Sequence, residues 1–279
     1  MKFGIRMCPT DYAIDVVRLA RAVEERGFES LWLPEHSHIP LDSTGPFADG
    51  AVPMEYKHAL DPFVALGAAA AATTTLKLGT GVCLVMQRDP IALAKQVASV
   101  DLLSNGRFLF GIGGGWNLAE MRNHGTDPDR RWRLVRERVQ AMRRIWMEDA
   151  AEFHGRFVDF GPIWSWPKPV QRPHPPVIVG GDAPGTLKRV LDYGDEWMPI
   201  TPKPAERLAA RAAELQRLAA ERGRAPLPVT AYWASPEPAD IGAYAAAGVS
   251  RCVFTVPAAP AAEVLPLLDR LASSVLTLA

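Results

Sequence analysis

A glutamate followed by a histidine, Glu35-His36, stands at the end of a short apolar stretch over residues 30–33. A histidine can accept and donate a proton near neutral pH, and a carboxylate beside it can orient the ring or hydrogen-bond a ligand. We therefore expect His36 to be an acid–base residue, with Glu35 as its partner or as a ligand contact. A histidine that caps a loop beside a solvated carboxylate is the structural alternative.

Two histidines, His36 and His38, also have the spacing of the first metal-binding pair of barrel hydrolases. Such sites need further histidines and an aspartate at the ends of later strands. The remaining histidines lie away from the strand ends that we expect: His58, His124, His154 and His174. The three cysteines have no CxxC spacing and follow apolar residues, which is typical of reduced, buried thiols: Cys8, Cys83 and Cys252. We expect no metal site.

A first glycine run, Gly113-Gly114-Gly115, precedes Trp116. Because glycine has no Cβ, such a run lets the backbone approach a flat ligand closely. It is not a dinucleotide fingerprint, since Trp116 takes the third glycine position and the run does not follow a first strand. Trp116 would line a pocket or pack in the core.

A second glycine pair, Gly180-Gly181, precedes Asp182 and a helix expected over residues 185–193. Free amides at a helix N-terminus bind anions, so a phosphate could lie here. Asp182 would oppose this, because its charge would repel a phosphate, or its side chain would cap the same amides.

These groups all follow apolar segments that alternate with helical patterns. We expect strands over residues 3–7, 30–33, 76–85, 107–112, 177–179, 196–200, 227–231 and 252–256. We expect helices over residues 11–26, 61–72, 90–103, 130–147, 185–193, 205–222, 240–247 and 261–272. Nearly all-apolar strands predict a parallel sheet covered by helices, and eight of them close a barrel. A doubly wound sheet would have fewer strands and a nucleotide fingerprint after the first.

Residues 151–176 are rich in Pro, Trp and Phe and interrupt this alternation, which predicts a β-hairpin insertion. The sequence thus predicts an α/β fold, a (β/α)8 TIM barrel, in which functional groups gather at the carboxyl ends of the strands. The 279 residues fit one such domain over residues 1–279.

The chain has 31 basic and 31 acidic residues, and this balance argues against a nucleic-acid or membrane-surface partner. The apolar stretch over residues 63–86 contains Lys77, so a buried helix followed by a buried strand explains it better than a membrane span. Without a signal-peptide pattern, and with reduced cysteines, we expect a cytoplasmic protein.

Several longer segments resemble the luciferase-like monooxygenase superfamily, and within it the coenzyme F420-dependent oxidoreductases. The matching segments cover nearly the whole chain: ARAVEERGFESLWLPEH, LGTGV, RDPIALAKQVASVDLLSNGRFLFGIGGGWN, AEFHGRF, PKPVQRPHPPVIVGG and YGDEWMP. The resemblance implies a bacterial luciferase-like barrel with a deazaflavin or flavin across its mouth. It also implies a homodimer that acts on a small-molecule substrate.

The resemblance also assigns residues. It implies a non-prolyl cis peptide at Gly81-Val82, which together with Cys83 would back the cofactor ring, and it places Glu35-His36 beside that ring. Gly113, Gly114, Gly115 and Trp116 would form a neighbouring wall, and Gly180, Gly181 and Asp182 would lie near the phosphate. Some relatives have a glutamate, proposed as an acid, where this chain has Trp116, and Glu120 one turn later need not replace it.

The implied chemistry is hydride transfer with F420, reducing an activated C=C, C=O or imine or oxidising an alcohol. The alternative is an FMN-dependent monooxygenase, and a non-catalytic flavin-binding relative is a third interpretation. FMN-binding relatives often have Ser or Thr after the glycine pair, and neither position after Gly181 has a hydroxyl, which favours F420. The Ala- and Arg-rich composition, typical of a GC-rich genome, favours F420 as well. We expect pocket walls from residues 37–57 and 164–166, with residues 45–56 as a lid.

Overall fold

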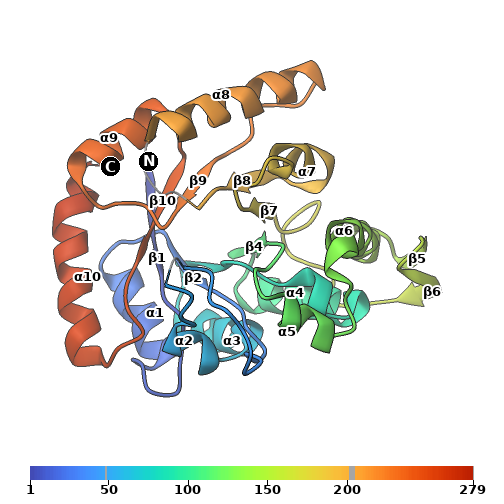
Figure 1. The fold of residues 1–279 in the computed structure, drawn as a ribbon, viewed down its shortest axis with the longest axis horizontal. Helices are drawn as coiled ribbons and strands as arrows, with labels where there is room; N and C mark the ends of the chain where they lie inside the picture. The colour runs from blue at the N-terminus through green and yellow to red at the C-terminus, as the bar shows by residue number, and fades with distance from the viewer. Residues whose placement is uncertain (48, 201–204, 279) are drawn as a thin grey trace.

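Eight parallel strands lie at the centre of the molecule, and helices alternate with them along the chain and cover their outer side (Figure 1). The computed structural model describes residues 1–47, 49–200 and 205–278. The parallel strands are β1 (Lys2–Arg6), β2 (Ser30–Leu33), β3 (Lys77–Thr80), β4 (Phe108–Ile112), β7 (Val177–Gly180), β8 (Glu196–Met198), β9 (Thr230–Tyr232) and β10 (Arg251–Thr255). Their order is β8-β7-β4-β3-β2-β1-β10-β9, and parallel bridges from Trp197 to Val229 and from Ile200 to Tyr232 nearly close the barrel.

The helices come between these strands, as the sequence predicts. They are α1 (Val16–Glu25), α2 (Met54–Lys57), α3 (Pro62–Ala72), α4 (Pro90–Leu103), α5 (Leu118–Asn123), α6 (Arg131–Met147), α7 (Thr186–Tyr193), α8 (Ala205–Glu221), α9 (Pro238–Ala246) and α10 (Ala261–Val275). Single 3₁₀ turns cover Val85–Gln87, Pro128–Arg130 and Leu276–Leu278. An antiparallel hairpin, β5 (Ala150–His154) and β6 (Asp159–Trp164), extends from one side (Figure 1). The predicted barrel is therefore confirmed.

Element boundaries differ from the prediction in a few places. The third strand ends at Thr80 instead of continuing to residue 85, because the chain turns at a cis peptide between Gly81 and Val82. The first helix begins at Val16 and not at residue 11, since the Asp15 side chain accepts a hydrogen bond from the Arg18 amide and caps it there. The short helices α2 and α5 were not predicted. Ala48, in the expected lid, lies outside the described residues.

Aspartate caps also start the two helices that flank the third strand. Asp61 accepts hydrogen bonds from the Phe63 and Val64 amides, and Asp89 accepts one from the Ala92 amide. A proline follows each aspartate at the first helical position, where it has no intrahelical bond to lose. These local signals fix where α3 and α4 begin.

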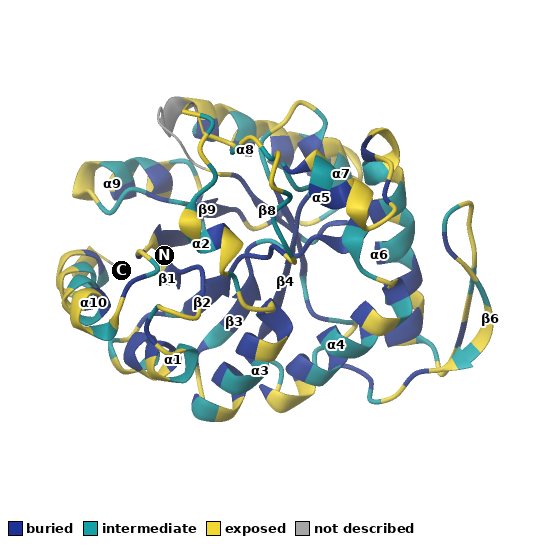
Figure 2. Ribbon diagram, turned by 60° about the horizontal axis from the view of Figure 1, so that its bottom comes forward, coloured by how far each residue is buried: buried dark blue, intermediate teal, exposed yellow. Residues whose placement is uncertain are grey.

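Large side chains fill the interior of the barrel, where the strands are buried (Figure 2). Trp32 is fully buried there, and its indole donates a hydrogen bond to the Ser30 hydroxyl at 2.9 Å. A Cβ on Gly79 of the adjacent strand would lie 2.4 Å from the Trp32 ring, so only glycine fits beside it.

Within the described residues, no helix is both long and apolar enough to span a bilayer.

A buried ionic cluster closes the opposite, amino-terminal end of the barrel. The Arg251 guanidinium donates hydrogen bonds to both carboxylate oxygens of Glu29, at 2.9 and 3.0 Å, and to Glu196 at 2.9 Å. It also donates to the Thr230 hydroxyl at 2.8 Å. Because these partners begin three different strands or precede them, the cluster ties the strands together below the core.

Candidate active site

A cavity of about 540 Å³ opens at the carboxyl ends of the strands. Its volume is in the range of sites that bind small molecules and cofactors. The expected site residues that line it are Glu35, His36, Gly81, Val82, Gly113, Gly114, Gly115, Trp116, Gly180, Gly181 and Asp182. Cys83 is fully buried and is not among the lining residues. The lid segment contributes Pro46, Phe47 and Tyr56, whereas the 164–166 segment contributes none of the lining residues.

His36 lies in the cavity wall with both ring nitrogens in contact with protein groups. Its Nδ1 is 2.8 Å from the Glu120 carboxylate, and the Trp116 indole N–H is 3.2 Å from its Nε2. The indole can only donate, so Nε2 must be the acceptor and Nδ1 must carry the proton that Glu120 accepts. Tyr56 packs against the ring, with centroids 4.8 Å apart. This tautomer leaves Nε2 unprotonated in a residue that lines the cavity.

Glu120 is fully buried and fixes the orientation of the His36 ring through its hydrogen bond with Nδ1. The amide of Glu120 is fixed by the Asn117 side chain, which caps α5. Burial raises the pKa of the Glu120 carboxyl, but hydrogen bonds from His36 and from the Ser37 amide, at 2.9 Å, outweigh this and lower the pKa. The carboxylate therefore stays charged and accepts the Nδ1 proton of His36. The sequence did not assign it this role.

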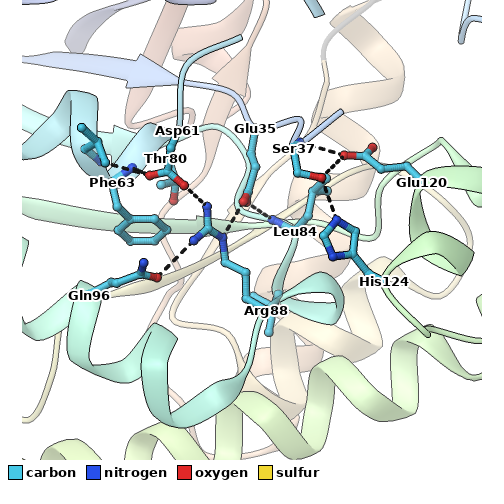
Figure 3. A network of polar contacts seen from close by, with 12 residues as sticks. Glu35, Ser37, Asp61, Phe63, Thr80, Leu84, Arg88, Gln96, Glu120 and His124 are labelled. Atoms are coloured by element: carbon cyan, nitrogen blue, oxygen red, sulfur yellow. Dashed lines mark hydrogen bonds and ion pairs between the residues drawn. The ribbon is translucent and has the colours of Figure 1, made fainter. Parts of the chain in front are cut away.

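Glu35 does not orient His36, contrary to one of the two roles that the sequence suggested for it. Its carboxylate accepts a hydrogen bond from the Arg88 guanidinium at 2.5 Å and another from the Leu84 amide at 2.6 Å (Figure 3). Arg88 also binds Asp61 at 2.6 Å. Glu35 thus ties the end of β2 to the chain that follows the cis peptide.

His38, which has the spacing of a metal pair with His36, contacts Ser37 and Asn123 through its ring nitrogens, at 2.9 Å each. The Ser37 hydroxyl in turn lies 2.7 Å from His124 (Figure 3). In the described part of the chain, no group of three or more His, Cys, Asp or Glu side chains is placed to hold a metal.

The cis peptide between Gly81 and Val82 lies at the cavity, where the resemblance implied it. The Tyr232 hydroxyl donates a hydrogen bond to the Gly81 carbonyl at 2.6 Å. A Cβ on Gly113 would lie 2.5 Å from Val82 Cγ2, and one on Gly180 would lie 2.8 Å from Val82 Cγ1. These two glycines therefore make room for Val82 itself, and the sequence reasoning had assigned that space to a ligand.

One end of the cavity, around Trp132, is cationic. Arg189 stacks on the Trp132 ring, 3.8 Å from its centroid, and donates a hydrogen bond to the Thr186 hydroxyl at 3.1 Å. Arg131 lies 5.7 Å from the centroid of the same ring and also lines the cavity. The Nε atoms of both arginines are buried and have no acceptor among the described residues. Burial lowers the pKa of the Arg189 guanidinium.

Asp182 does not oppose anion binding in the way that the sequence suggested. Its carboxylate pairs with Arg207 at 3.1 Å and Arg211 at 2.8 Å. The residue before α7 is Gly185, which provides no side-chain cap, so Asp182 does not occupy the helix amides. Gly181 has φ of 102°, a conformation that favours glycine.

Sequence reasoning missed several lining residues: Arg6, Arg131, Trp132, Thr186, Arg189, Tyr232 and Trp233. Three of them had a usable signal. Arg6 is the last residue of the first strand, Tyr232 is the last residue of β9 and Trp233 follows it, so the rule that barrel sites gather at strand ends would have found all three. The others depend on how distant segments pack.

Comparison with known proteins agrees with this geometry. Residues 6–240 match the model of the family described as luciferase-like monooxygenase. An uncharacterized Mycobacterium tuberculosis protein is 39% identical over 284 residues, covering 98% of each chain. The FMNH(2)-dependent dimethylsulfone monooxygenase of Pseudomonas putida is 32% identical over 49% of this chain and 38% of its own length. The coenzyme F420-dependent tetrahydromethanopterin reductase from Methanopyrus kandleri superposes with a TM-score of 0.80 at 17% identity, covering 99% of this chain and 98% of its own.

The match of the family model over most of the chain leads to one assignment. This chain belongs to the luciferase-like monooxygenase family, whose relatives include both F420-dependent and FMN-dependent enzymes.

Proposed function

We propose that this protein is an oxidoreductase that transfers a hydride between coenzyme F420 and a small organic substrate, with His36 moving the proton. The observation that carries the proposal is the environment of His36, which lines the cavity with Nε2 as an acceptor while Glu120 holds Nδ1 at 2.8 Å. A buried imidazole with a fixed tautomer and a carboxylate behind it is suited to acid–base catalysis.

The residues present fit such a cofactor. Val82 and the glycines around it offer an apolar wall for a flat ring, and Arg131, Arg189 and Thr186 offer donors for a phosphate. When bound, the deazaflavin supplies a ring carbon that accepts or donates a hydride. These groups support binding of the ring against Val82 and of the phosphate beside the two arginines.

The chain's own residues would then handle the substrate proton. When an alcohol is oxidised, the lone pair on His36 Nε2 accepts the hydroxyl proton, and the charged Glu120 stabilises the imidazolium that forms. When a C=C, C=O or imine is reduced, His36 begins as the imidazolium and donates its Nε2 proton to the substrate. The Trp116 indole keeps the ring in place through its contact at Nε2, and it must yield this contact to the substrate.

A specific observation also favours the second candidate, an FMN-dependent monooxygenase. The absence of a hydroxyl at the two positions after Gly181 favoured F420, but Thr186 brings a buried hydroxyl to the same end of the cavity. Two arginines at that end would suit the dianionic phosphate monoester of FMN as well as the phosphodiester of F420. Cofactor binding must decide between these two functions.

The test is titration of the purified protein with F420, FMN and riboflavin, with binding measured as quenching of the fluorescence of its eight tryptophans. We expect micromolar affinity for F420 and weaker binding of FMN. Arg189→Met should weaken binding of either phosphorylated cofactor about tenfold without affecting riboflavin, since it removes one charged hydrogen bond. Arg18→Met, on the exposed face of α1, is the matched control.

The outcomes separate the candidates. Tight binding of FMN alone would replace the proposal with the monooxygenase function, and failure of both cofactors to bind would overturn both. His36→Ala should bind F420 like the wild type but turn over much more slowly, whereas unchanged turnover would remove His36 from the mechanism. F420 binding without reduction by any alcohol would favour the non-catalytic interpretation.

We further propose that the protein is a homodimer, which analytical sedimentation tests, and that it is cytoplasmic, which cell fractionation tests.

A further inference from the structure

Arg6, at the end of β1, lines the cavity although it is 4% exposed. One terminal nitrogen of its guanidinium binds Glu55 at 3.1 Å, and Tyr56 and Tyr232 are neighbours of the charge. Its Nε is buried and has no acceptor among the described residues. The proposed proton transfer at His36 does not use this cation, so its place in the cavity needs another explanation.

Trp233 lies beside Arg6, with the guanidinium carbon 5.7 Å from the centroid of its ring. Its φ is 61°, a left-handed conformation that bulky residues seldom adopt. The indole Nε1 is buried and has no acceptor in the part of the chain that the structure describes. Such backbone conformations are concentrated at ligand-binding positions.

The cavity wall around these two donors is aromatic. Phe47 from the lid segment stacks on Trp233 with centroids 6.1 Å apart, and Tyr232 lies on its other side at 6.4 Å. Tyr56 connects this region to His36, 4.8 Å from that ring. A ligand whose polar group reached Arg6 would therefore place its apolar body against aromatic rings, within reach of the histidine.

Two buried donors without acceptors, one of them on a permanent cation, call for an acceptor that the protein does not supply. A carboxylate is the group that matches, since it is planar, accepts hydrogen bonds from several donors and carries the opposite charge. We propose that Arg6 and Trp233 bind the carboxylate of the substrate, so that the enzyme acts on small, flat organic acids. This inference rests on the proposed function for the reaction, but the binding site it describes can be tested alone.

Glu55 would compete with a substrate carboxylate for Arg6, which gives the proposal a second test. It lies on α2 in the lid segment, its side chain is 22% exposed, and its carboxylate already binds Arg6. A substrate carboxylate would share the guanidinium with it or displace it. Removing the charge of Glu55 should therefore strengthen binding of an anion, whereas removing the charge of Arg6 should weaken it.

The experiment measures binding of benzoate and cinnamate against their primary amides, by calorimetry and tryptophan quenching, with and without bound cofactor. In the wild type we expect the acid to bind at least tenfold more tightly than the amide. Arg6→Gln should abolish that preference, a loss of about tenfold to a hundredfold for a charged hydrogen bond. Glu55→Gln should raise the affinity for the acid several-fold, and Trp233→Phe should lower it several-fold while keeping the ring. Arg18→Gln is the control.

Each outcome decides the matter. If the amide binds as well as the acid, or if Arg6→Gln keeps the preference, the two donors bind water or a neutral group and the proposal is wrong. Failure of all four probes to bind at 10 mM (about the weakest affinity of interest) would also overturn it. Should Arg6→Gln weaken F420 or FMN binding instead, Arg6 belongs to the cofactor site, and the proposed function stands without the substrate inference. If the wild type binds no cofactor but still selects acids, the carboxylate site stands and the proposed function fails.

Discussion

Replacing Glu120 with glutamine tests the arrangement behind His36 most directly. Both oxygens of Glu120 accept hydrogen bonds, Oε1 from the Ser37 amide at 2.9 Å and Oε2 from His36 Nδ1 at 2.8 Å. A glutamine has only one oxygen, so its NH₂ group must face one of these donors. The backbone amide cannot change, so the NH₂ group should face Nδ1 and force the imidazole proton onto Nε2. That proton would oppose the Trp116 indole and leave no base on the cavity side.

The size of the effect follows from charge and tautomer. With the negative charge of Glu120 roughly 4 Å from the imidazolium charge, an effective dielectric constant of about 20 gives about 4 kcal/mol of stabilisation. Losing it corresponds to a decrease of about a thousandfold in rate, in the middle of the range that acid–base groups contribute. We therefore expect kcat to fall by about 10² to 10³, while the cofactor affinity stays within twofold.

The assay is steady-state turnover with the cofactor that binds, over a range of pH, alongside cofactor titration and thermal unfolding. Glu120→Gln removes a negative charge beside the ring and the base at Nε2, so the pH profile of kcat should change as well as its height. Glu25→Gln, exposed on α1, is the matched control. A folded Glu120→Gln protein with turnover within about twofold of the wild type would refute the reasoning about His36 and its partner.

Three further predictions concern the cavity wall and the stability of the barrel. Gly113→Ala should weaken cofactor binding about tenfold, because its Cβ would lie 2.5 Å from Val82 Cγ2, whereas Gly67→Ala, with open space around its Cβ, should not; titration measures both. Arg251→Met should lower the free energy of unfolding by about 3–5 kcal/mol in urea, since it leaves the buried Glu196 carboxylate without its cation; a loss below 1 kcal/mol would contradict this. Burial raises the pKa of Glu24, but hydrogen bonds from backbone amides outweigh it and lower the pKa to about 2. Because the folded pKa lies below the unfolded one, this stabilisation is present above about pH 4.5 and is lost as the pH falls toward 2. After a discount for exposure we expect about 1 kcal/mol, seen as a smaller loss of stability in acid for Glu24→Gln.

Local sequence patterns were sufficient for the fold. Apolar strands, aspartate caps such as Asp61 and Asp89, and the glycine that follows a helix are each written in a few consecutive residues, and they determine which segments become strands or helices. The alternation of those elements then leaves a closed parallel barrel as the architecture that buries every strand. The same rule placed His36, Gly81 and Gly180 at one end of the barrel.

The partners of those residues were decided only by the tertiary structure. Glu120 lies 84 residues from His36, and no local pattern says that it, and not the adjacent Glu35, will accept the imidazole proton. Likewise Val82 sits between Gly113 and Gly180 because three strands meet there. Which side chains meet depends on how the closed barrel brings strand ends and loops together, and short-range patterns contain no information about that. The sequence by itself determined that a histidine would stand at the mouth of a barrel. Only the packing of α5 against that mouth decided which carboxylate holds it.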